Sequence, residues 1–216
     1  GHEAELIPCA SDPDSLDAII DGTTGRALID GTAPHMLDPA YPGASDILVN
    51  AGDAWDEDKL RARKDEIIRL SDEGNGCHAQ AAAYVAAAGA LMRRCRAIAL
   101  RHVDEAAVRA LADGVRLPMG EGPPRVPEYR LLSAVSVGRV EFFKGTIDAL
   151  CESKLVVADE WGAASNALLA RVRRAAQDAN RRAILCPCSV CADKLDHVLL
   201  PDDGLFNFAY RYRRGL

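Results

Sequence analysis

Short apolar runs alternate with amphipathic stretches along this chain, and this alternation predicts its fold. Five runs are typical of buried strands, because each is brief and most are bounded by Asp, Gly, Ser or Pro. The predicted strands are Ala4–Cys9, Arg26–Asp30, Lys154–Ala158, Ala183–Cys186 and Leu205–Ala209. Because helical patterns lie between the strands, we expect an α/β fold with a largely parallel sheet.

The long stretch between the second and third strands predicts a helical arm. Asp56 is a candidate N-cap, and apolar residues at helical spacing continue from there to about Glu73. Gly and Asn at residues 74–76 predict a break in this helix. An alanine-rich helix over Cys77–Arg101 and a shorter one over Glu105–Leu111 are expected to complete the arm.

A segment rich in Pro and Gly, residues 116–129, predicts a linker. The expected domains are therefore a partial α/β half over 1–55, the helical arm over 56–115, the linker, and a second α/β half over 130–216. Two helices are predicted in the second half: Arg139–Cys151 and Asn166–Gln177.

The chain also contains a weak internal repeat. Residues 7–25, IPCASDPDSLDAIIDGTTG, align without gaps to residues 186–204, CPCSVCADKLDHVLLPDDG. The identical pairs are Pro8/Pro187, Cys9/Cys188, Asp14/Asp193, Leu16/Leu195, Asp17/Asp196 and Gly25/Gly204. A predicted strand precedes and another follows each copy, which favours duplication and two related halves.

Composition narrows the class of protein. The chain has 216 residues, 49% hydrophobic and 27% charged, and no apolar run approaches the ~18 residues of a membrane span. Residues 1–129 hold 13 Lys and Arg against 22 Asp and Glu, which argues against nucleic-acid binding. Seven cysteines and no recognisable secretory signal predict reduced thiols and a cytoplasmic protein.

Three segments resemble an uncharacterised bacterial family of tandem P-loop ATPase-like proteins. They are PCASDPDSLDAII, ALIDGTAPHMLDPAYPGASDILVNAGDAWDEDKL and KLDHVLLPDDGL. The resemblance implies a P-loop NTPase-like fold in each half, with ATP and Mg²⁺ as ligands and a Walker A loop ahead of each Pro-Cys strand. We expect the first half to lack this loop and the second to carry a degenerate one, DEWGAASN, at residues 159–166.

The first half supplies one group of candidate site residues. Asp30 follows an apolar strand, as a Walker B aspartate does, and is the candidate Mg²⁺ ligand. The resemblance implies a catalytic role for Asp30 and His35, with Thr32 near the nucleotide. The alternative is structural: Asp30 caps a turn that Pro34 stiffens.

The degenerate loop supplies the second group, in which Gly162, Ser165 and Asn166 are the candidate phosphate-binding residues. A working P-loop needs two glycines, a lysine and a Ser or Thr. Here the lysine is absent, and Asp159 and Glu160 put negative charge where phosphate would bind. Hydrolysis is therefore expected to be weak or absent, and helix capping by Ser165 explains the same residues without a ligand.

The remaining candidate chemistry lies in the C-x-C-x-x-C motif of Cys186, Cys188 and Cys191, whose thiolates could bind zinc. The motif has no second knuckle, so buried thiols are the favoured interpretation. Three hypotheses stay open: a nucleotide-binding module, a non-catalytic scaffold that uses the helical arm to bind a protein partner or a second copy, and a small zinc protein.

Overall fold

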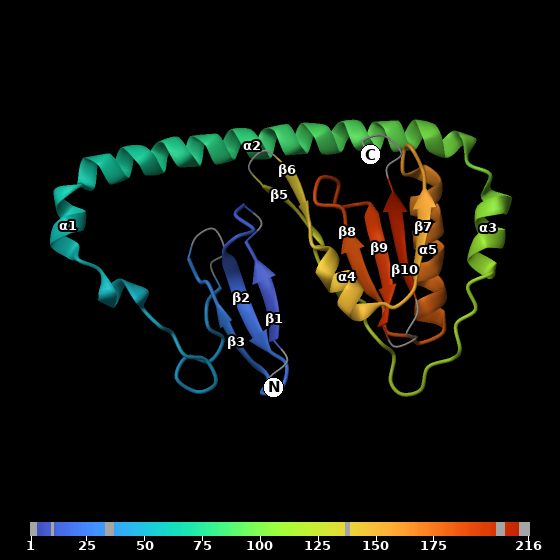
Figure 1. Cartoon of the computed structure of the whole chain (residues 1–216), viewed down its shortest axis with the longest axis horizontal. Helices are drawn as coiled ribbons and strands as arrows, with labels where there is room; N and C mark the ends of the chain where they lie inside the picture. The colour runs from blue at the N-terminus through green and yellow to red at the C-terminus, as the bar shows by residue number, and fades with distance from the viewer. Residues whose placement is uncertain (1–3, 10, 33–36, 137–138, 202–205, 212–216) are drawn as a thin grey trace. The chain divides into compact units, whose positions relative to one another are not determined.

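The computed structural model describes residues 4–9, 11–32, 37–136, 139–201 and 206–211. The chain divides into two compact units, Gly1–Ala83 (unit 1) and Tyr84–Leu216 (unit 2). The elements that begin in unit 1 are β1 (Ala4–Pro8), β2 (Leu16–Asp21), β3 (Arg26–Ile29), the 3-10 turn η1 (Ala51–Ala54), α1 (Glu57–Ala62) and α2 (Lys64–Ala99), which continues into unit 2 (Figure 1).

Unit 1 contains a three-stranded antiparallel sheet in the order β1-β2-β3. The predicted strands at Ala4–Cys9 and Arg26–Asp30 are confirmed as β1 and β3. The intervening strand β2 was not predicted. It follows the turn at Asp12–Ser15, where the Ser15 N–H donates to the Asp12 carbonyl at 2.9 Å.

Unit 2 holds the larger sheet. Its further elements are η2 (Leu100–His102), α3 (Glu105–Asp113), β4 (Glu128–Tyr129), β5 (Ser133–Ser136), β6 (Arg139–Phe142), α4 (Lys144–Leu150), β7 (Lys154–Ala158), α5 (Ala163–Asp178), β8 (Ile184–Pro187), β9 (Leu195–Leu200) and β10 (Phe206–Arg211). Strands β5 and β6 form a separate hairpin, and the five-stranded sheet has the order β4-β8-β9-β10-β7.

The α/β class is confirmed, but the expectation of a largely parallel sheet is wrong. Strands β8, β9 and β10 are antiparallel neighbours, and parallel pairing occurs in the outer pairs β4–β8 and β10–β7. The reason is the short connection between β8 and β9, because a chain that turns back within a few residues returns antiparallel, whereas parallel neighbours need a long crossover.

The core of unit 2 lies on both faces of this sheet. On one face, helices α5 and α3 pack against β8 and β9 through Leu168, Leu169, Val172, Ala176, Val108 and Ala112. On the other face, Leu132, Ile147 and Cys151 pack against Ile184, Cys186 and Leu199. The three layers bury Leu185, Val198, Leu199 and Leu200 completely.

Helix α2 runs for 36 residues, so the predicted break at residues 74–76 is wrong. Each glycine costs a helix about 1 kcal/mol, but a long alanine-rich helix with favourable side-chain pairs absorbs that cost. Arg69 pairs with Glu73 at 2.8 Å, immediately before the glycines. No helix among the described residues combines the length and apolar character needed to cross a membrane.

One predicted helix of unit 2 is wrong in its bounds. The helix expected over Arg139–Cys151 is strand β6 followed by the shorter helix α4, because the β-branched and aromatic residues at its start pair with β5. The predicted linker lies within unit 2, where the Gly120 N–H donates to the Ala179 carbonyl at 2.7 Å and the Arg125 N–H donates to Asn180 Oδ1 at 3.0 Å.

The internal repeat has a matching backbone geometry in both copies. In the first, Ile7 pairs with Ala18 and the register shifts at Pro8; in the second, Cys186 pairs with His197 and the register shifts at Pro187. The turns agree as well, since the Cys9 N–H donates to the Ser15 carbonyl at 3.0 Å and the equivalent Cys188 N–H donates to Lys194 at 2.9 Å. An irregularity shared at the same aligned position favours duplication of the meander.

Candidate functional site

The loop between β7 and α5 lies at the carboxyl ends of two parallel strands, β7 and β10. Ala158 at the end of β7 is opposite Arg211 at the end of β10. This edge of an α/β sheet is where such folds bind ligands. The candidate phosphate-binding residues Gly162, Ser165 and Asn166 are therefore at a plausible position in the fold, and their contacts decide what they can bind.

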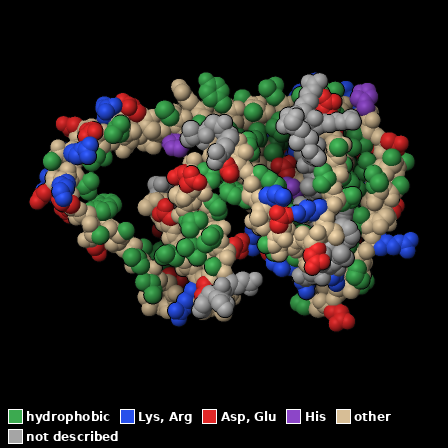
Figure 2. Space-filling model, in the orientation of Figure 1, with side chains coloured by type: hydrophobic (Ala, Val, Ile, Leu, Met, Phe, Trp, Pro, Cys, Tyr) green, Lys and Arg blue, Asp and Glu red, His purple; other side chains and the backbone are tan. Residues whose placement is uncertain are grey.

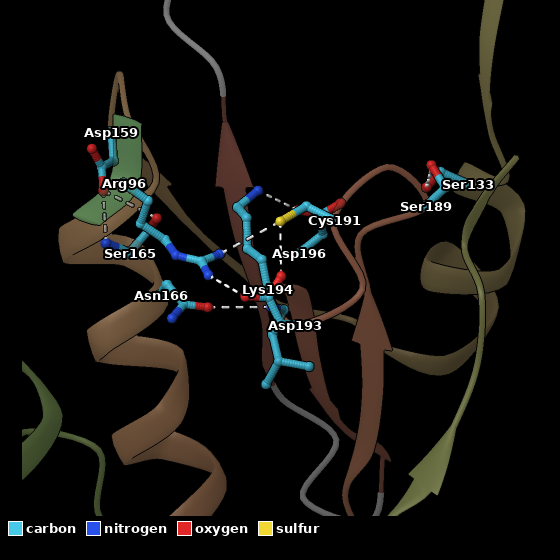
Figure 3. A network of polar contacts seen from close by, with 11 residues as sticks. Arg96, Ser133, Asp159, Ser165, Asn166, Ser189, Cys191, Asp193, Lys194 and Asp196 are labelled. Atoms are coloured by element: carbon cyan, nitrogen blue, oxygen red, sulfur yellow. Dashed lines mark hydrogen bonds and ion pairs between the residues drawn. The ribbon is translucent and has the colours of Figure 1, made fainter. Parts of the chain in front are cut away.

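The Asp159 carboxylate caps the first turn of α5 (Figure 3). Its Oδ2 accepts hydrogen bonds from the Ser165 N–H at 2.9 Å and the Ser165 Oγ–H at 3.1 Å, and its Oδ1 accepts from the Trp161 N–H at 3.1 Å. Ser165 is 1% exposed. The structural alternative for this loop therefore fits, with one correction: Asp159 is the capping group and Ser165 is the donor.

This cap changes what the helix N-terminus offers to a ligand. Free amides and the helix dipole normally attract an anion there. Here the carboxylate of Asp159 already binds the Ser165 amide, and a phosphate at the same place would meet that negative charge. Gly162 precedes the helix with φ 70°, a left-handed conformation that glycine adopts without strain.

Asn166 also makes a contact within unit 2. Its Oδ1 accepts a hydrogen bond from the Leu195 N–H at 3.2 Å, which joins the first turn of α5 to the start of β9. The side chain therefore positions the helix on the sheet. An Asn oxygen in this role does not replace the hydroxyl that holds Mg²⁺ in a working P-loop.

Asp30 and Thr32, the candidates of the first half, lie in unit 1 directly after β3. The Asp30 Oδ1 accepts hydrogen bonds from the Thr32 N–H at 2.9 Å and the Thr32 Oγ1–H at 2.8 Å. These bonds form a turn, as the structural alternative predicts. His35 lies outside the described residues.

A polar network that the sequence did not reveal joins α2 to the loop between β8 and β9 (Figure 3). Arg96 Nη2 lies 2.6 Å from Asp193 Oδ2, and the Cys191 thiol donates to Asp193 Oδ1 at 2.9 Å. Both contacts lower the pKa of Asp193, with the Cys191 hydrogen bond the larger cause. The identity of Asp14 and Asp193 in the repeat marked the position, but nothing in the sequence paired it with Arg96.

Two more polar residues of this region, Lys194 and His197, are buried within unit 2. Lys194 is 4% exposed and its Nζ lies 2.5 Å from Asp196 Oδ1. His197 is 6% exposed and stacks on Phe142, with ring centroids 5.4 Å apart. The ion pair of Lys194 with Asp196 offsets part of the cost of removing the Lys194 ammonium from water.

The three cysteines of the C-x-C-x-x-C motif are buried free thiols. Burial raises the pKa of each, to about 12 for Cys186, where the nearby negative charge of Asp196 adds to the effect. Zinc binds the thiolate form, so a raised pKa opposes metal binding at neutral pH. Across the described ranges, no group of three His, Cys, Asp or Glu side chains is arranged to hold a metal ion.

Comparison with known proteins adds no relative: no family model, curated protein or solved structure matches this chain. Function is therefore argued from the contacts above. The described candidate residues of the two loops form caps, turns and contacts between elements, and burial raises the pKa of the thiols of the cysteine motif.

Proposed function

We propose that this chain is a non-catalytic protein-interaction module, in which unit 2 is the folded support and unit 1 carries a surface that a partner buries. One observation carries the proposal. Among the described residues of unit 1, Ala18 alone is buried, at 8% exposed. A sheet needs a covering layer over its apolar face to be stable, and this layer is what we expect the partner to supply.

The apolar side chains of unit 1 are exposed on the sheet and on the segment that follows it (Figure 2). Leu6 and Leu28 of the sheet are 57% and 68% exposed. The following segment exposes Leu37, Tyr41, Ile47, Leu48, Val49 and Trp55. Apolar side chains exposed in this number are uncommon on a protein that works alone and are typical of interaction sites.

Only part of the predicted helical arm belongs to the contact surface that we propose. Residues 56–83 are exposed throughout except for the half-buried Gly74, and they include the apolar Ile67 and Leu70. By contrast, α3 buries Val108 and Ala112 against α5, so this part of the arm belongs to the core of unit 2. We therefore place the contact surface of the arm on residues 56–83.

Light scattering over a range of protein concentrations tests the proposal, together with the fluorescence of the apolar dye 8-anilinonaphthalene-1-sulfonate (ANS). We expect dye binding and a mass that rises with concentration, because exposed apolar faces adhere to one another without strand pairing when no partner covers them, and we expect Leu28→Ser in unit 1 to reduce both signals. The matched control is Val126→Ser, which removes an 85% exposed apolar side chain from unit 2 and should change neither signal. A monomer at every concentration without dye binding would contradict the proposal.

A second candidate function is the binding of ATP with Mg²⁺ at the loop between β7 and α5. The order strand, loop, helix beside the parallel strand β10 favours it, because nucleotides bind at such edges. The Asp159 cap opposes it. A melting temperature that rises with MgATP would support this candidate, since a ligand that binds the folded state stabilises it. An unchanged melting temperature at saturating MgATP would exclude it.

A further inference from the structure

The uncovered sheet of unit 1 has a covered counterpart in the same chain. Strands β1 and β2 align with β8 and β9 at a constant offset, with the same pairing and the same register shift before the turn. Strand β3 then pairs with β2 as β10 pairs with β9, antiparallel in both cases. The second copy therefore indicates which elements this meander packs against when it is part of a complete layer structure.

One face of the unit 1 sheet carries a row of three apolar side chains. Leu6, Ile19 and Leu28 are cross-strand partners, so they point to the same face. They are 57%, 38% and 68% exposed. The counterparts of the first two are Leu185 and Val198, which are completely buried in the cluster formed with α5.

On the opposite face of the unit 1 sheet, apolar side chains are again more exposed than their counterparts in unit 2. Ile7, Ala18 and Ile29 are partners across the three strands, and Ile7 and Ile29 are 36% and 47% exposed. Cys186, the counterpart of Ile7, is completely buried in the cluster that contains Ile147 of α4 and Cys151. The first copy thus has apolar residues on both faces and no covering helix among the described residues of unit 1.

The two sheets also differ at one edge, because the third strand of the meander has a further neighbour only in unit 2. Strand β3 is an outer strand of its sheet, whereas its counterpart β10 pairs along five residues with β7, in parallel. Helix α5 follows β7 directly and covers the sheet. One continuous segment therefore supplies both the edge strand and the helix in unit 2.

We propose that unit 1 binds a polypeptide segment of the same kind as β7–α5, whose strand pairs in parallel with β3 and whose amphipathic helix covers the row Leu6, Ile19 and Leu28. This inference rests on the proposed function and names the class of partner. A second copy of the chain has no such segment to spare, because its own α5 buries Leu168 and Leu169 in unit 2.

An extended variant tests the inference on the otherwise intact chain. A second copy of residues 144–182 is placed directly before Ala4, replacing residues 1–3, so that it leads into β1 as the original leads into β8. We expect amide hydrogen exchange in β3 to slow at least tenfold and the dye fluorescence to fall. The control carries Leu155→Pro and Val156→Pro in the added copy, because adjacent prolines remove the pairing N–H whichever way the strand faces.

The outcomes separate the two proposals. Slow exchange in β3 that the proline control abolishes supports the inference. An added segment that leaves β3 unprotected overturns it, while the proposed function stands if the original chain still binds dye and associates. If the original chain does neither, both proposals fail. Protection of β3 in the original chain that rises with concentration would identify a second copy as the occupant and overturn the inference.

A second measurement covers the case in which the extended variant does not fold. A synthetic peptide of residues 154–178 is titrated into the original chain, and exchange in β1, β2 and β3 is followed. Protection of β3 by this peptide, and not by the peptide with the two prolines, supports the inference. No protection at saturating peptide overturns it.

Discussion

Substituting Gly89 by Ala tests how α2 meets the rest of unit 2. Gly89 is the one buried residue of this helix, and a Cβ added to it would lie 2.5 Å from the carbonyl oxygen of Val190. Real Cβ atoms do not approach a backbone oxygen so closely, so the helix or the loop must move. Arg96, two turns further along, holds the same loop through Asp193 at 2.6 Å and would move with the helix.

The expected magnitude is the difference of two effects. Alanine in a helix interior is about 1 kcal/mol more favourable than glycine. Forcing an extra carbon into a packed contact costs about 1–3 kcal/mol, and a rigid backbone atom as the neighbour places this case toward the upper end. We therefore expect Gly89→Ala to lower the free energy of unfolding of unit 2 by about 1–2 kcal/mol.

Urea unfolding in a Trp55→Phe background measures this effect, since Trp161 is then the remaining tryptophan and reports on unit 2. The matched control is Gly76→Ala on the same helix, where nothing lies within 4 Å of the added Cβ. In Gly76→Ala the added methyl group meets no neighbour, so only the higher helix propensity of alanine changes the stability of the helix. Amide exchange around residue 76 should therefore slow. If Gly89→Ala raised the urea midpoint, the contact between α2 and Val190 would be refuted.

Three further predictions follow from single contacts. Asp159→Ala should destabilise unit 2 by about 1 kcal/mol in urea unfolding, because the Ser165 amide loses its cap, and Asp159→Asn should retain most of the stability. Glu128→Gln should cost about 0.5–1 kcal/mol at pH 7, because Arg182 binds Glu128 at 2.7 Å and both side chains are about one-third exposed. Arg182 lowers the pKa of Glu128, so this difference should shrink as pH falls from about 4.5 through the lower folded pKa; a constant difference would contradict it. Iodoacetamide with mass spectrometry should find two exposed thiols alkylated first and four buried thiols alkylated on unfolding, and equal rates would contradict the buried placement. The exposed thiols are Cys77 and Cys95, and the buried ones are Cys151, Cys186, Cys188 and Cys191.

The strands that could be predicted from sequence are those whose apolar runs end at turn residues, as β1 and β7 do. Strand β2 was missed because its sequence, LDAIID, places acids at both ends of a short run and reads equally well as part of a helix. The repeat nevertheless aligned this run with β9, which was also not predicted, so β2 and β9 share one sequence signal. Pairing direction was not predictable, because it depends on connection lengths that follow only once every strand is known.

The candidate sites show a similar limit. Sequence patterns identified the loop after β7 and the turn after β3, and they included the structural alternative for each. They did not identify the partner of the Ser165 amide. The negative charge of Asp159 was taken only as an obstacle to phosphate, although its carboxylate caps the helix six residues further along the chain. The contact of Arg96 with Asp193 spans 97 residues, and a single sequence contains no signal for such a pair.

The Asp159 cap in unit 2 and the uncovered sheet of unit 1 together indicate that a partner binds at unit 1. In unit 2 the positions that the resemblance assigns to a ligand are filled by the chain's own groups: a carboxylate binds the helix amide, and Asn166 ties the helix to β9. Removing Asp159 frees the amides of Trp161 and Ser165 but supplies neither the lysine nor the second glycine that a phosphate needs. The reverse holds in unit 1. In unit 2 the strands β8–β10 are covered by β7, α4 and α5, whereas the equivalent strands β1–β3 of unit 1 have exposed apolar side chains on both faces. Unit 1 has apolar side chains that nothing in the described structure covers, whereas the polar groups of the loop after β7 in unit 2 are already hydrogen-bonded. We therefore expect substitutions of Leu6, Ile19 and Leu28 to alter association more than substitutions in the loop after β7.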